Sequence, residues 1–197
     1  MATETKSDPR RRMIQSAALL FRSQGIEGTS FSDVLEHSGA PRGSIYHHFP
    51  GGKAQLAEET TRYAGDFLAA GLAAALADRD PVAAIGRFTS FWLDLLRDAD
   101  FAAGCPVVAA AVEGDRLPGA RDAAGAAFAT WEDLLADALV ERGLSRDRGL
   151  AVATLAIAAI EGGIVLARAQ RSTKPLERVA GEIERLVGGV VEEAARA

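Results

Sequence analysis

A short stretch of the sequence, residues 42–49, concentrates side chains that donate hydrogen bonds and reads Arg-Gly-Ser-Ile-Tyr-His-His-Phe. If this stretch is helical, with about 100° per residue, Ile45 and Phe49 share one apolar side, while Gly43 and His47 lie nearly opposite. A helix with such an outer side fits the DNA major groove, which is about 12 Å wide, and the glycine lets the backbone approach closely. The pattern indicates contacts with nucleic acid, although an ordinary amphipathic helix with a polar outer face has the same pattern.

The types of these side chains suggest how each would contact DNA. The hydroxyl groups of Ser44 and Tyr46 suit phosphate oxygens, and Arg42 can reach a guanine edge or a phosphate. Ser32 and the free N–H groups at the start of its helix would bind another phosphate. Phosphate contacts of this kind position a protein on the duplex, and base contacts read the sequence.

Two predicted helices precede this stretch and position it. Residues 9–24 carry one apolar stripe at helical spacing, and a glycine follows them. Ser30 is the expected N-cap of a second helix over residues 31–38, with Asp33 as its capping-box partner. A glycine then supplies the turn into a third helix, expected over residues 41–49. Two short helices joined by a tight turn predict a helix-turn-helix.

The rest of the chain shows only helical periodicity, without the alternation of apolar and polar residues that marks strands. Glycine and proline residues separate six further predicted helices, which cover residues 53–77, 81–99, 106–112, 119–142, 145–170 and 175–195. We therefore predict an all-α fold of about nine helices.

The composition is that of a globular protein with one basic end. Of the 197 residues, 48% are hydrophobic and 25% are charged, which argues against disorder. Residues 1–53, which include Lys6, hold seven Lys or Arg against five Asp or Glu, whereas residues 54–197 hold fifteen against twenty-two. This asymmetry favours an anionic partner for the N-terminal end. The single cysteine, Cys105, excludes an internal disulfide and a cysteine-clustered zinc site.

Familiar catalytic motifs are missing from the sequence. It has no Gly-x-Ser-x-Gly, His-Glu-x-x-His or Gly-x-Gly-x-x-Gly, and residues 49–54 lack the first glycine and the Ser/Thr of a phosphate loop. Ser44 and His48 lie four residues apart without an acid to orient the histidine. We expect no catalytic residues, no cofactor and no metal. The longest uncharged apolar runs have twelve residues, below the roughly 18 that span a membrane, so a cytoplasmic protein is expected.

Three stretches, residues 28–35, 38–49 and 52–56, resemble the DNA-binding domain of TetR-family transcriptional regulators. That family shows a Thr-containing start to its second helix, a glycine turn, and a Gly-Ser/Thr-aliphatic-Tyr-x-His/Tyr-Phe recognition helix followed by a lysine. The hinge at residues 50–52, Pro-Gly-Gly, is longer and more apolar than the two polar residues that usually precede that lysine. Residues 104–113 are similar to a subgroup that includes repressors of lincomycin and multidrug efflux genes.

The resemblance implies a role for each polar residue around the third helix. Tyr46, His48 and Lys53 would bind backbone phosphates, and Arg42 and His47 would face bases. The partner would be double-stranded operator DNA, read by a domain over residues 1–53. The expected DNA-binding set is Ser30, Ser32, Arg42, Gly43, Ser44, Tyr46, His47, His48 and Lys53.

The remaining residues, 54–197, are expected to form a homodimer and to bind a small-molecule effector, as the resemblance implies. The predicted helix over residues 145–170 is apolar nearly all round between Arg148 and Glu161, so it must be buried on two sides. One side can face the core and the other a partner chain, since helix-turn-helix proteins usually read DNA as dimers. A central helix of a monomeric bundle has the same composition. The expected interface is Ile157, Ile160, Ile164, Ile183, Val187 and Val190.

Large aromatic residues gather in the middle helices and would line an apolar pocket, although plain core packing explains any single one of them. Glu161 is followed by two glycines and further apolar residues, so its carboxyl is a candidate for burial and ligand contact. Glu113 is expected to be a helix-end or surface carboxylate. The expected effector pocket is Tyr63, Phe67, Phe88, Trp92, Cys105, Phe128, Trp131 and Glu161.

The sequence thus predicts a ligand-responsive transcriptional regulator. It would bind a palindromic operator as a dimer, act as a repressor, and leave the DNA when a small, mostly apolar effector binds. The alternative is a helical protein-interaction module that does not bind DNA.

Overall fold

The computed structural model describes residues 8–196, and Lys6, part of the basic N-terminal end, lies outside them. Helix α1, Pro9–Gln24, begins where the Asp8 carboxylate accepts a 3.1 Å hydrogen bond from the Arg10 N–H. It ends at Gly25, whose φ of +78° is a conformation that side-chain-bearing residues rarely adopt.

Helix α2, Phe31–Ser38, begins with the predicted capping box. The Asp33 N–H donates a 3.2 Å hydrogen bond to Ser30 Oγ, and the Ser30 N–H donates a 2.7 Å bond to Asp33 Oδ2. These bonds from Ser30 hold the pKa of the Asp33 carboxyl below its usual value. Gly39, with a left-handed φ of +63°, ends the helix and starts the turn.

Helix α3 is shorter than expected and spans Ile45–His48 rather than residues 41–49. The residues before it form a turn in which both the N–H and the hydroxyl of Ser44 donate to the Pro41 carbonyl oxygen, at 2.9 and 2.7 Å. That oxygen is thereby occupied by a local bond, and a glycine at position 43 further disfavours a helical first turn.

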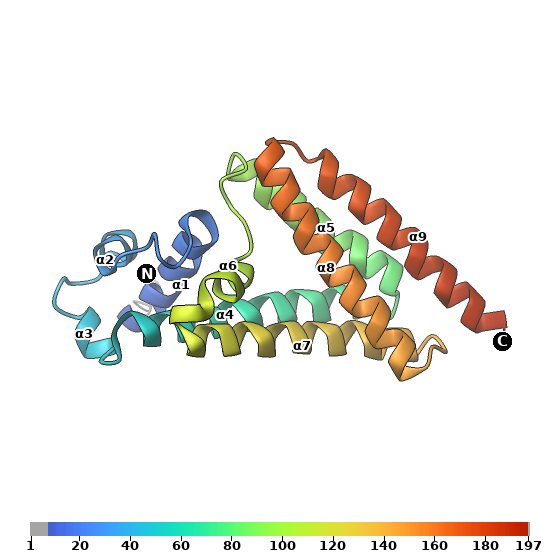
Figure 1. Ribbon diagram of the computed structural model, residues 1–197, viewed down its shortest axis with the longest axis horizontal. Coiled ribbons are helices and arrows are strands. Elements are labelled where there is room, and N and C mark those ends of the chain that lie inside the picture. Colours follow the sequence, from blue (N-terminus) through green and yellow to red (C-terminus); the bar gives the residue numbers. More distant parts are fainter. Residues whose placement is uncertain (1–7, 197) are drawn as a thin grey trace, which may run out of the picture. The chain divides into compact units, whose positions relative to one another are not determined.

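The other helices follow the predicted order. They are α4 (Gly52–Ala75), α5 (Pro81–Asp98), α6 (Pro106–Glu113), α7 (Pro118–Val140), α8 (Arg146–Gln170) and α9 (Lys174–Arg196), with a 3-10 turn at Gly114–Arg116. Residues 8–196 contain no strand, so the predicted all-α fold of about nine helices is confirmed (Figure 1).

The chain folds as two compact units. The first comprises the residues up to 65 together with 106–125, and the second comprises 66–105 together with the residues from 126 onward. Helices α4 and α7 each run from one unit into the other, and α6 belongs to the first unit. The expected division after residue 53 is a division by function, and it stays a prediction.

The first unit is built around α1, which packs against α2 and α6. Met13, Ala17 and Phe21 form its buried stripe, and Val34 is the buried residue of α2, which packs against it. Arg10, at the start of α1, lies over the ring of Phe49 at 5.3 Å and forms an ion pair with Glu59. These contacts fix the base of α3 and the start of α4.

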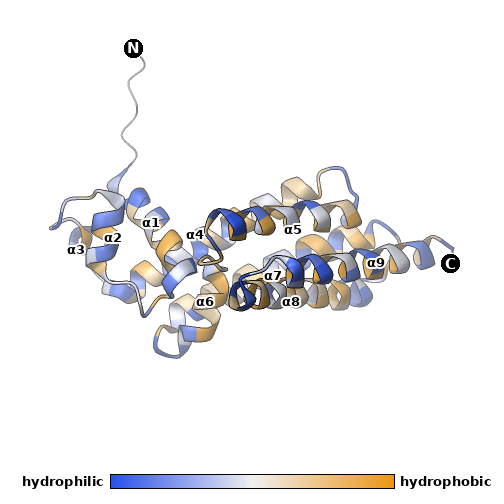
Figure 2. Cartoon of the chain, turned by 90° about the horizontal axis from the view of Figure 1, so that it is seen from above, coloured by the Kyte–Doolittle hydropathy of each residue, from blue (hydrophilic) through white to orange (hydrophobic). Residues whose placement is uncertain are grey.

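In the second unit, α9 packs against α8 and α5. Figure 2 shows hydrophilic and hydrophobic residues alternating along α9, as expected for a helix with one buried stripe. That stripe requires a correction to the expected dimer interface. Five of the six expected interface residues are buried within this unit, where α9 packs against α8 and α5. The residues concerned are Ile160, Ile164, Ile183, Val187 and Val190.

Helix α8 is long and apolar enough to cross a membrane by length and composition, which the separate runs of twelve residues did not indicate. About 39% of its most apolar window is buried inside the unit. The opposite side exposes Leu155, Val165 and Leu166, each about half accessible to solvent. The expected absence of a membrane-spanning segment stays a prediction.

Candidate DNA-binding face and ligand cavity

The outer side of α3 has the composition that the helical wheel predicted. Ile45 and Phe49 are fully buried beneath it, whereas Arg42, Gly43 and His47 are exposed. A Cβ atom added at Gly43 would meet no atom of the described residues within 4 Å, so the backbone there is open to a close approach. This side therefore offers donors to solvent around an open backbone.

Tyr46 lies on the same exposed surface and is 70% accessible to solvent. The edge-to-face contact of its ring with Phe31 of α2, at 5.5 Å between centroids, holds the hydroxyl in an outward position. His47 and His48 are also in edge-to-face contact, at 5.3 Å, and His48 is half-buried. A large exposed aromatic side chain held by a ring contact suits a fixed hydrogen bond to phosphate.

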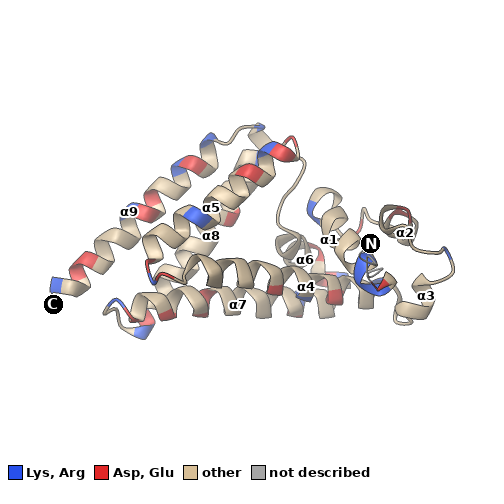
Figure 3. Ribbon diagram, turned by 180° about the vertical axis from the view of Figure 1, so that it is seen from behind, with Lys and Arg blue, Asp and Glu red and all other residues tan. Residues whose placement is uncertain are grey.

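Three further residues of the expected DNA-binding set have hydrogen-bond partners within the chain. The Lys53 ammonium group donates a 3.1 Å hydrogen bond to the carbonyl oxygen of Glu27, which leaves its other donors available. Ser30 Oγ caps α2, and the Ser44 hydroxyl donates to Pro41. Ser32 is exposed in the first turn of α2. Figure 3 shows further basic residues at the start of α1.

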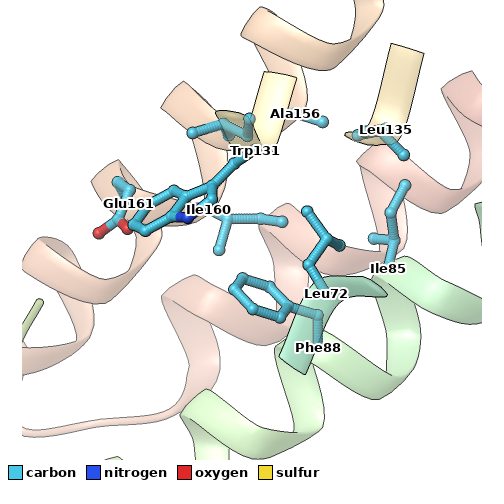
Figure 4. A pocket seen from close by; sticks show the side chains of 9 residues that line it. Leu72, Ile85, Phe88, Trp131, Leu135, Ala156, Ile160 and Glu161 are labelled. Carbon is cyan, nitrogen blue, oxygen red and sulfur yellow. The ribbon is translucent and has the colours of Figure 1, made fainter. Parts of the chain in front are cut away.

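The second unit contains a small cavity lined by α4, α5, α7 and α8 (Figure 4). Its volume is about 20 Å³, enough for one water molecule. Of the expected pocket residues, Phe88, Trp131 and Glu161 line it. Aliphatic side chains complete the lining: Leu72, Ile85, Leu135, Ala156, Ile157 and Ile160. Ile157, assigned to the dimer interface from the sequence, is therefore a cavity residue.

The remaining expected pocket residues lie elsewhere. Trp92 is buried but does not line the cavity, and its ring contacts Phe88 at 6.4 Å. Tyr63 belongs to the first unit, where its hydroxyl accepts a 3.3 Å hydrogen bond from Gln15. Phe128 contacts Trp131 edge-to-face at 5.2 Å. Phe67 is 58% exposed, because the side of α4 that carries it faces solvent rather than the core.

Glu161 is the polar side chain of the cavity lining. Its Oε2 atom is shielded from water and has no hydrogen-bond partner, although the residue as a whole is only half-buried. Burial raises the pKa of this carboxyl to about 7, and a hydrogen bond with the Cys105 side chain opposes that rise. The carboxyl therefore changes its charge near neutral pH.

Sequence reasoning missed the role of Glu113 at the end of α6. Its carboxylate accepts a 2.7 Å hydrogen bond from the Glu27 N–H, and a methyl group at Gly25 would collide with it. The ion pair of Arg116 with Glu27, at 3.5 Å, adds a second contact to the same loop. The signal available in the sequence was Gly25, since a glycine leaves space where another residue would have a side chain. It did not indicate that the Glu113 carboxylate fills that space.

The described residues offer no cluster of three His, Cys, Asp or Glu that could hold a metal ion. What the chain presents is a helix-turn-helix with an exposed donor surface and a second helical unit with an apolar cavity. This is the architecture of DNA-binding regulators that respond to small molecules.

Comparison with known proteins identifies the family. Residues 13–60 match the family described as bacterial regulatory proteins, tetR family, and residues 81–182 match the LmrA/YxaF-like transcriptional regulator C-terminal domain. The HTH-type transcriptional regulator Rv0196 of Mycobacterium tuberculosis is 41% identical over 95% of this chain and 98% of its own length. The HTH-type transcriptional regulator LmrA of Bacillus subtilis is 31% identical over 91% and 97%.

The fold of a solved structure agrees. A TetR transcriptional regulator from Legionella pneumophila, at 24% identity, has a TM-score of 0.83 over 92% of this chain and 98% of that one. The chain belongs to the TetR family of transcriptional regulators, within the part that shares the LmrA/YxaF-like C-terminal domain. The resemblance found in the sequence is thereby confirmed, including the subgroup indicated by residues 104–113.

Proposed function

We propose that this regulator binds a palindromic operator as a homodimer, represses the adjoining genes, and leaves the DNA when a small, mostly apolar effector occupies the cavity of the second unit. It would act in the cytoplasm and catalyse no reaction. The observation that carries the proposal is the exposed surface around Arg42, Gly43, Tyr46 and His47, where donors surround a backbone that nothing covers. Family membership weighs against the alternative of an interaction module that does not bind DNA.

The experiment that tests DNA binding is a mobility-shift assay with genomic fragments, followed by footprinting of the shifted one. If a dimer neutralises about six to ten phosphates, its affinity falls on the order of 10³-fold or more between 50 and 200 mM salt. A footprint with two-fold symmetry and this salt dependence supports the proposal. Binding to no genomic fragment, or binding that salt does not weaken, contradicts it.

For the dimer we propose the exposed side of α8 in place of the residues named from the sequence. Leu155, Val165 and Leu166 give this side its large apolar side chains, and the exposed Gly162 lies between them in the sequence. Three half-exposed aliphatic side chains on one helix form the kind of surface that a partner chain covers. An equivalent α8 in the partner would form an isologous contact.

A further inference from the structure

Two hollows of the second unit share one side chain. The cavity lined in part by Glu161 is too small for an effector, since ligand pockets usually have volumes of about 300 Å³ or more. An open groove of about 390 Å³ lies along α4 and α5, lined by Phe67, Leu68, Gly71, Ala74, Ala75, Arg87, Phe88 and Phe91. Phe88 lines both the groove and the cavity. Movement of this one ring would join them into a space of ligand size.

Glu161, one of the residues that line the cavity, has an unsatisfied polar atom. Its Oε2 has no hydrogen-bond partner among the described residues and is shielded from water, and the Cys105 thiol is hydrogen-bonded to the same carboxyl. The other residues that line the cavity are all apolar or aromatic, with no Lys or Arg among them. A carboxylate in such surroundings requires a partner to offset the cost of its burial.

Two aromatic rings line the same cavity, Phe88 from α5 and Trp131 from α7 (Figure 4). The face of an aromatic ring attracts a cation, most strongly where water is excluded. A buried carboxylate with aromatic rings in the same wall therefore favours a positively charged group over a neutral one. The surplus of acidic residues beyond residue 53 adds a general attraction for cations.

We infer that the effector is an aromatic or otherwise apolar molecule with one protonated nitrogen, and that the nitrogen reaches Glu161 by passing Phe88 from the groove between α4 and α5. This inference rests on the proposed function and names the chemical class of the effector. The apolar body stays in the groove, against Phe67 and Phe91. Arg87 does not repel the cation, because its guanidinium is bound to the Ala75 carbonyl oxygen and to Asp78.

The test compares three matched naphthalene compounds by calorimetric titration of the full chain: 1-naphthylmethylamine, 1-naphthalenemethanol and 1-naphthoate. At pH 8 we expect the amine to bind at least about tenfold more tightly than the alcohol, and the carboxylate not to bind. Glu161→Gln is expected to remove the preference for the amine, whereas Glu193→Gln, an exposed carboxyl of α9, keeps it. Equal affinity for amine and alcohol, or an unchanged preference in Glu161→Gln, overturns the inference.

Acidification provides a second readout of the same group. Because the pKa of Glu161 is about 7, lowering the pH from 8 to 6 protonates most of the carboxyl. The affinity for the amine should therefore fall about tenfold, while the affinity for the alcohol should not change. The thiol of Cys105 is the other titratable side chain known to be hydrogen-bonded to Glu161. Equal loss of affinity for both compounds contradicts the assignment to Glu161.

The route past Phe88 is tested by stopped-flow tryptophan fluorescence. Phe88→Ala and the more conservative Phe88→Leu should both speed association of the amine, several-fold or more. The preference for amine over alcohol should fall in both variants, because one ring that attracts the cation is lost, but should not vanish while Glu161 is present. Association at the wild-type rate in both variants overturns the route. Complete loss of the preference in both would assign the selection of the ligand to the ring of Phe88 and overturn the role of Glu161.

Failure of the inference is distinguishable from failure of the proposed function. If neither the amine nor the alcohol binds at millimolar concentration, but other compounds release operator DNA, the inference falls and the proposed function stands. If the amine binds with the expected dependence on Glu161 but saturating amine leaves the operator bound, the inference holds and effector-driven release fails.

Discussion

The backbone N–H of Glu27 donates a 2.7 Å hydrogen bond to Oε2 of Glu113, so the end of α6 holds the loop between α1 and α2. The loop is shaped for this contact, because Gly25 leaves room for the carboxylate where any side chain would collide with it. The same loop provides the carbonyl oxygen of Glu27 to Lys53 at the start of α4. Glu27 thus joins α6 to the helix that follows the DNA-binding residues.

We expect Glu113→Ala to loosen this loop. A hydrogen bond to a charged acceptor contributes about 1.5–3 kcal/mol, and its loss leaves the Glu27 N–H without its partner. Amide hydrogen exchange should therefore become faster at Glu27 and along α2. Glu192→Ala, at the exposed end of α9, serves as the matched control. Unchanged exchange at Glu27 would show that the contact does not hold the loop.

The same substitution is expected to affect coupling more than binding. Cys105, whose side chain is bonded to Glu161, directly precedes the first residue of α6, and Glu113 is its last. We therefore expect a shift at Cys105 on ligand binding to move α6 and, through Glu113, the loop. Glu113→Ala should leave the affinity for the ligand unchanged while reducing its effect on operator affinity, measured by fluorescence anisotropy. A full ligand response in this variant would place the coupling elsewhere, for example along α4.

The local pattern was enough to predict the helix-turn-helix. Ser30 with Asp33 defines a capping box through bonds between near neighbours, and the burial of Ile45 and Phe49 follows from helical spacing alone. Both features depend on residues only three or four positions apart in the sequence. The shortened α3 was missed because the Ser44 hydroxyl competes locally for a backbone acceptor, which a hydrophobic pattern does not record.

The second unit was harder to predict because its helices are apolar on more than one side. The sequence indicated that α8 must be buried on two sides, but it did not indicate which side faces α9 and which faces solvent. Ile160 and Ile164, which were assigned to the interface, are buried within the unit. In the sequence, Trp92 and Trp131 are equally good candidates for the pocket, yet only Trp131 lines the cavity. Which tryptophan does so depends on how four helices pack together.

On DNA, we expect two classes of variant. Tyr46→Phe and Lys53→Ala should weaken binding to all sequences about equally, because these groups are assigned to phosphates. Arg42→Ala and His47→Ala should change which bases are preferred, with a loss of about 1–3 kcal/mol of discrimination at the contacted position. Selection from random oligonucleotides by each variant measures both effects. An unchanged consensus for both base-facing variants would remove them from that role.

For the dimer, the effect of introducing a glutamate depends on whether the replaced side chain is exposed or buried. Leu155→Glu and Leu166→Glu change exposed side chains, so each chain should stay folded while the dimer separates. Val187→Glu places an unpaired charge in a fully buried site and should unfold the second unit. Sedimentation velocity with circular dichroism distinguishes these results, and Arg178→Glu on the exposed side of α9 is the control. Intact dimers for both α8 variants would move the interface to another surface.

Glu161 should make the folded protein less stable as the pH rises. A carboxyl whose pKa is lowered on folding has the opposite effect. Its pKa is about 7 in the folded chain and near 4.5 when exposed, so the folded state binds more protons between these values. The stabilisation is complete below about pH 4.5 and is lost as the pH rises through 7. Once the group is ionised, the lost stabilisation amounts to at most about 3 kcal/mol.

Glu161→Gln removes this charge and should be more stable than the wild type at pH 8 and equal to it near pH 4.5. Melting temperatures of the two proteins, followed across this range by circular dichroism, should therefore diverge by several degrees as the pH rises. Glu193→Gln should follow the wild type, because that carboxyl is exposed. The Cys105→Ala variant, which keeps Glu161, should differ from Glu161→Gln in melting temperature at high pH by more than the wild type does. The reason is that the hydrogen bond with Cys105 stabilises the ionised carboxyl. A constant difference between Glu161→Gln and wild type at every pH would mean that the carboxyl does not titrate in this range and is not buried as the structure places it.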